Sequence, residues 1–247
     1  MTIHVGLTLP SFVDDPEIPI AVARAAEAAE LDGVFVYDHL WRGDPPNRRA
    51  ALECFALLGA IAAETEHVQV GTLVARATLR PPATLANAFT TVQRVSGGRL
   101  LAAIGAGDSH SRAENEAFGL EFGSMVDRVD ALHAAVRAAV GNGFPVWVGG
   151  RAAQVRQVVA VADGWNSWGT EPSRFAEQTA LVRDVAPAAT LTWGGLARPL
   201  EEGAAALAAR LRPYVDAGAT WLIIGSVDAS DPANAAVVGD VRRRMNA

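Results

Sequence analysis

The stretch GVFVYDHLW, residues 33–41, changes character half way along its length. Its first five residues have the composition of a buried strand. Asp38, His39 and Trp41 then bring an acid, an imidazole and an indole, which can exchange protons or stack on a flat ring. A buried strand that ends in such side chains indicates a sheet whose carboxyl edge carries a functional site.

Short apolar runs like this one recur along the chain, and each is followed by an alanine-rich segment of helical length. This alternation is typical of βα units that build a parallel sheet. We expect strands at residues 3–9, 33–37, 68–74, 99–104, 145–148, 164–167, 190–194 and 220–224. Eight such units in 247 residues predict a single (β/α)8 TIM-barrel domain that spans residues 1–247. A doubly wound open sheet is the alternative, but the first βα turn, residues 9–12, lacks its Gly-x-Gly-x-x-Gly fingerprint.

The charge and composition narrow the classes of partner. The formal net charge is -6, and the only basic tract is the trio at residues 242–244, so a clustered positive face for nucleic acid is absent from the sequence. No apolar run is long enough to cross a bilayer, and the first ten residues lack a basic start and a cleavage site. We therefore expect a cytoplasmic protein with neither a nucleic-acid nor a membrane partner.

The residue types also exclude several chemistries. All 21 basic residues are arginine, which excludes a lysine Schiff base and a P-loop lysine. Cys54 is the only cysteine, and we expect it to pack inside a helix over residues 52–63. No metal site is expected, because the histidines (His4, His39, His67, His110 and His133) form no His-x-His or His-x-x-x-His pair.

Several polar and glycine residues fall at the carboxyl ends of the expected strands, where a barrel carries its active site. Asp38 and His39 follow the second strand directly. Glycine turns at residues 105–108 and 149–151 follow the fourth and fifth strands, and the second of them leads straight into a helix, which predicts an anion site. A glycine at position 71 predicts a bulge in the third strand. The structural alternatives are that Asp38 caps a helix, that His39 is solvated and that the glycines serve turn geometry alone.

Five blocks of the sequence resemble the bacterial luciferase-like flavin oxidoreductases, and in particular their F420-dependent branch. These blocks are DHLW (38–41), VGTLV (70–74), SGGR (96–99) leading to GAG (105–107), PVWVGG (145–150) and ADGWN (162–166). The resemblance implies a TIM barrel that binds FMN or the deazaflavin coenzyme F420, with a non-proline cis peptide in a third-strand bulge near residues 71–73. One departure is clear, because only residues 141–144 separate Val140 from Pro145, where the family usually carries a long insertion.

The resemblance also assigns roles to particular residues. His39 and Asp38 would be catalytic, and Trp41 and Trp168 would line the substrate pocket. The cofactor would be bound by Gly71, Thr72, Leu73, Gly105, Gly107, Asp108, Gly149, Gly150 and Arg151, with its phosphate on the last three. Arg99 and Asp163 lie at the opposite ends of their strands, where we expect buried ion pairing to fix the structure.

These expectations combine into a flavin- or deazaflavin-dependent oxidoreductase that transfers a hydride between reduced coenzyme F420 and a small organic substrate. F420 is favoured over FMN by the short Asp-His-Leu-Trp segment, by the Gly-x-Gly-Asp turn and by the arginine-for-lysine composition. His39 suits a proton donor, and Asp38 would orient the imidazole or bind the ring. An FMN-dependent luciferase-like monooxygenase and a non-catalytic flavin-binding protein are the alternatives, the second because the insertion is missing. By analogy with the family, the chain would form a homodimer.

Overall fold

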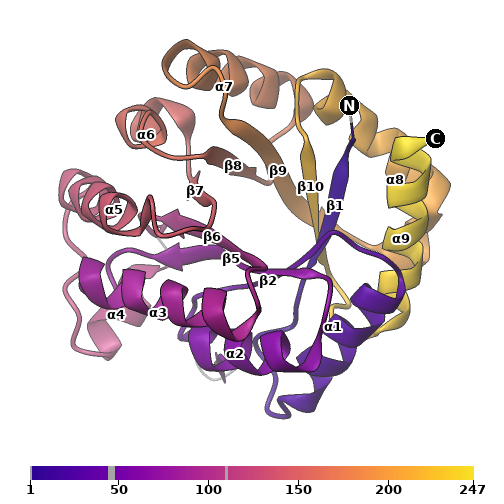
Figure 1. The fold of residues 1–247 in the computed structure, drawn as a ribbon, viewed down its shortest axis with the longest axis horizontal. Helices are drawn as coiled ribbons and strands as arrows, with labels where there is room; N and C mark the ends of the chain where they lie inside the picture. Colours follow the sequence, from indigo (N-terminus) through magenta and orange to yellow (C-terminus); the bar gives the residue numbers. More distant parts are fainter. Residues whose placement is uncertain (1, 44–47, 109–110) are drawn as a thin grey trace.

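The computed structural model describes residues 2–43, 48–108 and 111–247, so Ser109 and His110 lie outside the described residues. Within these ranges eight parallel strands close into one barrel, and β1 pairs with both β2 and β10 (Figure 1). The barrel strands are β1 (His4–Thr8), β2 (Gly33–Val36), β5 (Gln69–Arg76), β6 (Leu100–Gly105), β7 (Val146–Gly149), β8 (Gly164–Trp168), β9 (Thr190–Ala197) and β10 (Trp221–Ser226). All eight expected strands are confirmed, and the closed sheet excludes the open doubly wound alternative.

Helices surround the barrel, with at least one after each barrel strand (Figure 1). They are α1 (Glu17–Ala28), α2 (Cys54–Glu64), α3 (Pro82–Val95), α4 (Ser111–Ala117), α5 (Met125–Ala139), α6 (Ala152–Val159), α7 (Pro172–Val185), α8 (Pro199–Asp216) and α9 (Ala233–Asn246). Cys54 is buried at the start of α2, which confirms its expected packing role.

The two faces of each strand bury different sets of side chains, because successive residues of a strand point to opposite sides. On β10, Leu222 and Ile224 belong to the cluster packed against the helices, whereas Trp221 and Ile223 belong to a second cluster inside the barrel. The Phe35 ring lies in this inner cluster, 6.1 Å from the Trp147 ring. Large side chains thus fill the barrel interior, so a ligand site is expected beyond them, at the carboxyl ends of the strands.

The lower end of the barrel is held by side chains that bond backbone groups. The Arg99 guanidinium donates to the carbonyl oxygens of Ala62, Thr65 and Val68, each at 2.7 Å. An Asp163 carboxylate oxygen accepts from the Val146 N–H at 2.8 Å. The expected ion pairing at these two residues is therefore wrong. The physical reason is that carbonyls near the end of α2 have no partner within the helix, and a guanidinium with five N–H donors can satisfy several of them.

Asp32 fixes the same end of the barrel through contacts with β1 and α9. Its carboxylate accepts from the Val5 N–H at 2.8 Å and from Arg242 Nε at 2.7 Å, and it lies 3.3 Å from His4 Nδ1. Burial by itself would raise the pKa of Asp32, but the hydrogen bonds from His4, Arg242 and Val5 lower this pKa to about 2. The carboxylate is therefore a structural anion at neutral pH.

A small antiparallel ribbon, which the sequence did not predict, follows β2. Its strands are β3 (Trp41–Arg42) and β4 (Arg49–Ala50), and Arg42 pairs directly with Arg49. The Leu52 N–H donates to the Ser11 carbonyl at 2.8 Å, which ties the ribbon to the segment after β1. This contact places the ribbon at the carboxyl end of the barrel.

Candidate active site

A cavity of about 290 Å³ lies at the carboxyl ends of β2, β5, β6, β7 and β8. It is lined by Tyr37, Asp38, His39, Leu73, Val74, Arg76, Gly105, Ala106, Gly107, Asp108, Ser111, Met125, Val129, Gly149, Gly150, Gln154, Val155, Asn166 and Trp168. The structure thus brings together most of the residues that the sequence placed on the rim. Thr72, Gly71, Trp41 and Arg151 are not among the lining residues.

The wall of this cavity on the β5 side is a bulge. The pairing of β5 with β6 shifts register between Thr72 and Ala75, and the peptide bond between Leu73 and Val74 is cis. Both Leu73 and Val74 line the cavity. The bulge and the cis peptide were expected on this strand near residues 71–73, and they lie at the carboxyl end of that range, where the cis bond joins Leu73 to Val74.

Gly71 and Thr72 lie below the bulge in the wall of the barrel. A Cβ atom on Gly71 would come within 2.5 Å of the Leu101 carbonyl oxygen and 3.0 Å of the Phe35 ring. The Thr72 hydroxyl donates to the Ala103 carbonyl at 2.7 Å. Both residues therefore serve the packing and bonding of the barrel, and neither reaches the cavity in which a cofactor was expected.

The Val74 side chain explains two of the rim glycines. A Cβ atom on Gly105 would lie 2.5 Å from Val74 Cγ2, and one on Gly149 would lie 2.6 Å from Val74 Cγ1. Real Cβ atoms do not approach other carbon atoms this closely, so glycine is required at the ends of β6 and β7 for Val74 to project into the cavity. These glycines thus shape the cavity wall, a role that differs from the anion binding expected for the turns.

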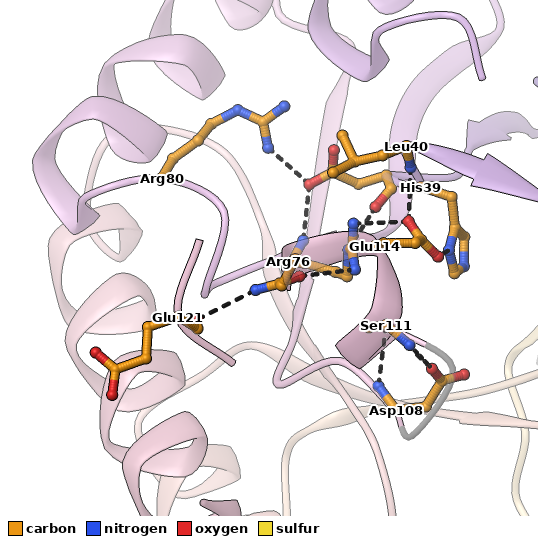
Figure 2. Close-up of polar contacts among 10 residues, drawn as sticks. His39, Leu40, Arg76, Arg80, Asp108, Ser111, Glu114 and Glu121 are labelled. Carbon is orange, nitrogen blue, oxygen red and sulfur yellow. Dashed lines mark hydrogen bonds and ion pairs between the residues drawn. The ribbon is translucent and has the colours of Figure 1, made fainter. Parts of the chain in front are cut away.

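His39 is hydrogen-bonded to a residue that the sequence reasoning missed. Its Nδ1 atom lies 2.7 Å from Oε1 of Glu114 on α4 (Figure 2). The other carboxylate oxygen of Glu114 accepts from the Leu40 N–H at 2.7 Å and from Arg76 Nη2 at 3.0 Å. Burial alone would raise the pKa of Glu114, but the hydrogen bonds from His39 and Leu40, with the charge of Arg76, lower it below its ordinary value.

An ionised Glu114 fixes the tautomer of the neutral His39 ring. A carboxylate can only accept, so the proton of the neutral imidazole must lie on Nδ1. The Nε2 atom is then free to accept a proton, or to donate one when the ring is charged. The imidazole is about one third exposed and lines the cavity, so this exchange can take place there.

Asp38 has different partners from those expected. One of its carboxylate oxygens accepts from the Arg76 backbone N–H at 2.9 Å and from Arg80 Nη1 at 2.7 Å. The expectation that Asp38 orients the His39 ring is therefore wrong, because Glu114 occupies that position. The buried Asp38 carboxylate instead joins the end of β2 to the end of β5.

Arg76 is the centre of this network. Its side chain is only 3% exposed, and its Nε atom donates to the Asp38 carbonyl at 2.7 Å. Burial lowers the pKa of Arg76, while the nearby Glu114 and Asp38 carboxylates oppose that shift. Arg76 thus links β5 to both the β2 loop and α4. The available sequence signal was its position: an arginine at the end of a barrel strand faces the rim.

The two glycine turns differ in what they offer to a ligand. Asp108 accepts hydrogen bonds at 3.0 Å from both the N–H and the hydroxyl of Ser111, at the start of α4. The Gly150 N–H donates to the Asn166 carbonyl at 3.2 Å, so it is engaged within the barrel, and the phosphate role expected for it stays a prediction. Gly150 has a φ of +141°, which explains why glycine stands there. Arg151 is exposed at the start of α6 and its side chain does not cap that helix, while the Gln178 side chain accepts from the Ala152 N–H at 3.0 Å.

The two tryptophans expected in the substrate pocket have separate positions. Trp168 lines the cavity, with its ring 5.9 Å from the Tyr37 ring in an edge-on arrangement. Trp41 instead lies on the β3–β4 ribbon under the guanidinium of Arg48, which is 3.9 Å from the ring centre. Trp41 therefore belongs to the surface beside the cavity.

Within residues 2–43, 48–108 and 111–247, no group of three or more histidine, cysteine or acidic side chains is arranged to hold a metal ion. No helix in these ranges is both long and apolar enough to span a membrane.

The fold and the site together define a TIM-barrel protein whose ligand cavity opens over a bulged third barrel strand. The chain belongs to the luciferase-like monooxygenase family, whose model matches residues 5–218. A relative in Beutenbergia cavernae, named F420-dependent glucose-6-phosphate dehydrogenase, is 37% identical over 139 residues. That match covers 55% of this chain and 38% of the relative.

Solved structures confirm the barrel. An F420-dependent secondary alcohol dehydrogenase in complex with an F420-acetone adduct superimposes with a TM-score of 0.83 at 16% identity, covering 98% of both chains. The FMN complex of a type II Baeyer-Villiger monooxygenase component from Pseudomonas putida gives 0.74 at 12% identity, covering 98% of both chains. At these identities the likeness concerns the fold alone.

Proposed function

We propose that the protein is an F420-dependent oxidoreductase that transfers a hydride between the deazaflavin and a small organic substrate. The observation that carries the proposal is the cavity with the Leu73–Val74 bulge on one side and the Nε2 edge of His39 available at its lining. The choice of F420 over FMN is supported by the relative in Beutenbergia cavernae, whose name specifies F420.

The residues of the cavity fit a flat ring system with polar edges. Leu73, Val74, Ala106, Val129 and Val155 provide apolar surface. Tyr37, Asn166 and Gln154 are polar residues of the same lining, although the Tyr37 hydroxyl donates to Thr8 and the Asn166 amide donates to Thr192. This combination of apolar walls and a few polar groups is typical of cofactor sites. When bound, the deazaflavin would supply the hydride chemistry.

In this reaction the role of the protein's own side chains is to hold and transfer a proton. When a hydride adds to a carbonyl, imine or activated alkene, the substrate atom that gains negative charge must receive a proton. His39 supplies it from Nε2, while Glu114 holds the ring at Nδ1 and stabilises its charged form. In the reverse direction the same Nε2 atom accepts the proton of an alcohol that is oxidised. The Tyr37 hydroxyl stays protonated, because burial raises its pKa to about 12.

The start of α6 is the proposed place for the cofactor phosphate. The Arg151 side chain does not cap this helix, and the preceding Gly150, which has a positive φ, lines the cavity. The positive end of a helix dipole favours an anion there. The N–H groups of Gly150, Ala152 and Gln154 already have acceptors, so the backbone donor proposed for the phosphate is the Ala153 N–H.

Titration of the purified protein with F420 tests the proposal. Deazaflavin fluorescence should change on binding at micromolar protein, and FMN should bind more weakly. Tight FMN binding without a response to F420 would favour the FMN-dependent monooxygenase, which the Pseudomonas putida neighbour makes the second candidate. Glucose 6-phosphate is the first compound to test as a hydride donor, because it appears in the name of the relative. The homodimer and the cytoplasmic location stay predictions.

A further inference from the structure

A second cavity, of about 630 Å³, lies beside the active-site cavity and shares Tyr37 with it. It is bounded by the ends of β1, β9 and β10 and by the β3–β4 ribbon. Its described lining includes Arg42, Arg48 and Arg49 but no aspartate or glutamate. We call it the arginine pocket. A local excess of positive charge is unexpected in a chain with 27 acidic and 21 basic residues.

Among the described residues, no acidic side chain balances the positive charge of these arginines. Arg42 and Arg49 lie directly opposite each other in the ribbon, and like charges in that position destabilise a strand pair. Within the described chain none of the three side chains makes an ion pair. The nearby Asp228 lies 3.7 Å from Arg198, outside the pocket lining. An oxyanion between the arginines would relieve the repulsion.

Two of the guanidinium groups are oriented by aromatic rings. Arg48 lies over the Trp41 ring at 3.9 Å, and Arg42 lies over the Phe12 ring at 5.7 Å. A guanidinium that stacks by its face keeps its N–H groups directed outward in its own plane. Those donors match the paired oxygens of a phosphate or a carboxylate.

A buried hydroxyl of the same pocket lacks a partner. Ser226, at the end of β10, is 7% exposed, and its Oγ atom makes no hydrogen bond to any residue that the structure describes. Buried polar atoms are nearly always bonded, so an unpartnered one in a cavity lining indicates a ligand atom or a water. The pocket also lies at the loops after the last two barrel strands, where TIM barrels frequently bind phosphate.

We propose that the arginine pocket binds the phosphate or carboxylate group of the substrate. Tyr37 lines both this pocket and the cavity that holds His39, so the two are neighbours, and the proposal places one small anionic molecule across both. This proposal extends the proposed function. Only the statement that the bound anion belongs to a substrate rests on that function, since the anion site itself is argued from the pocket. The substrate class is then a small organic phosphate or carboxylate whose reacting carbon lies near His39.

Anion binding can be measured without the cofactor. Calorimetric titration of the apoprotein with inorganic phosphate and with glycerol 3-phosphate should show saturable binding, and glycerol, the uncharged match, should show none. The double variant Arg42→Gln/Arg49→Gln should bind both anions at least tenfold more weakly. Its thermal midpoint should not fall, because the substitution removes a like-charge pair. Arg137→Gln, an exposed arginine on α5 without an ion pair, is the matched control and should bind as the wild type does.

Further titrations show whether the pocket binds the anionic group of the substrate or the phosphate of the cofactor. If the pocket serves the substrate, the double variant should bind F420 within about twofold of wild type. Equal losses for F420 and glycerol 3-phosphate would overturn the proposal, as would unchanged anion binding in the double variant. Arg48→Gln and Ser226→Ala test the same pocket independently, and each should weaken phosphate binding severalfold. A wild type that binds phosphate but no F420 would contradict the proposed function and leave the anion site standing.

Discussion

Replacement of Glu114 by glutamine tests the part of the site that the sequence did not reveal. One oxygen of Glu114 faces the His39 ring, and the other accepts from both Leu40 and Arg76. A glutamine side chain has one acceptor oxygen, which can still accept from the Leu40 N–H and from Arg76 Nη2. Its amide N–H₂ would then face His39 Nδ1, where a carboxylate oxygen stood. The imidazole must respond by moving its neutral-state proton to Nε2.

The magnitude follows from burial. The Glu114 and Arg76 side chains are 4% and 3% exposed, and removal of one partner of a buried ion pair costs about 3–5 kcal/mol. We expect a loss of about 3 kcal/mol in the free energy of unfolding, at the lower end of that range, because Asp38 still contacts Arg76. Turnover should fall about 10²- to 10⁴-fold, since the ring has the wrong tautomer and its charged form has lost its carboxylate.

The pH dependence has a definite sign. The pKa of Glu114 is lower in the folded protein than its ordinary value, so the unfolded chain binds more protons in the acid range and stability rises with pH there. The contribution of Glu114 is complete above its unfolded pKa of about 4.3 and is lost as pH falls through the folded value. The difference in unfolding free energy between wild type and Glu114→Gln should be constant above about pH 5 and shrink in more acid solution.

Three measurements check these expectations: urea unfolding across the acid range, ¹⁵N chemical shifts of the His39 ring, and turnover followed by deazaflavin absorbance. Glu116→Gln on the same helix is the control. The Glu116 side chain is 62% exposed, and its ion pair with the exposed Arg112 is long, at 3.7 Å, so its loss should have little effect. A Glu114→Gln protein with an unchanged His39 tautomer and wild-type turnover would refute the assignment of Glu114 as a positioning residue. A stability difference that is the same in acid as at neutral pH would refute the buried pairing.

His39→Ala should leave the thermal midpoint and the F420 affinity nearly unchanged but lower turnover about 10²- to 10⁴-fold; normal turnover would remove His39 from the chemistry. Gly149→Ala puts a Cβ atom 2.6 Å from Val74, so we expect a cost of about 1–3 kcal/mol in urea unfolding. It should also weaken F420 binding by displacing the bulge, and an unaltered titration would contradict this. Arg99→Ala should cost about 1–3 kcal/mol, because it leaves carbonyls without donors, while activity per folded molecule is retained. Asp32→Asn should cost about 2–3 kcal/mol above pH 4, and since the folded pKa is about 2, calorimetry should show this cost vanish as pH falls toward 2.

The barrel itself could be predicted because its signals are local. Each strand is a short apolar run, and each is followed by a helix rich in alanine, so the period along the chain is visible without any knowledge of contacts. The β3–β4 ribbon gave no such signal, because each of its strands has two residues. Pairs this short depend on tertiary contacts such as the bond from Leu52 to Ser11.

The site was less accessible to sequence reasoning, because its key contacts join distant segments. The rule that strand ends carry function found Asp38 and His39 but could not choose the partner of the imidazole. That partner, Glu114, is 75 residues away on a helix beyond β6. An adjacent acid such as Asp38 is an attractive guess, but consecutive residues at the end of a strand point to opposite sides. Asp38 accordingly contacts Arg80 and the Arg76 backbone, while His39 faces Glu114.

The missing insertion before β7 bears on whether the cavity can support a reaction. The structure closes that side of the cavity with Met125 and Val129 from the first turns of α5. A reciprocal capping box fixes the start of this helix: the Ser124 hydroxyl accepts from the Asp127 N–H at 3.2 Å, and the Asp127 carboxylate accepts from the Ser124 N–H at 2.8 Å. Such a box satisfies two helix-end donors at once and stabilises the first turn. The apolar wall therefore stands without the insertion, and the reason for expecting a non-catalytic flavin-binding protein is correspondingly weaker.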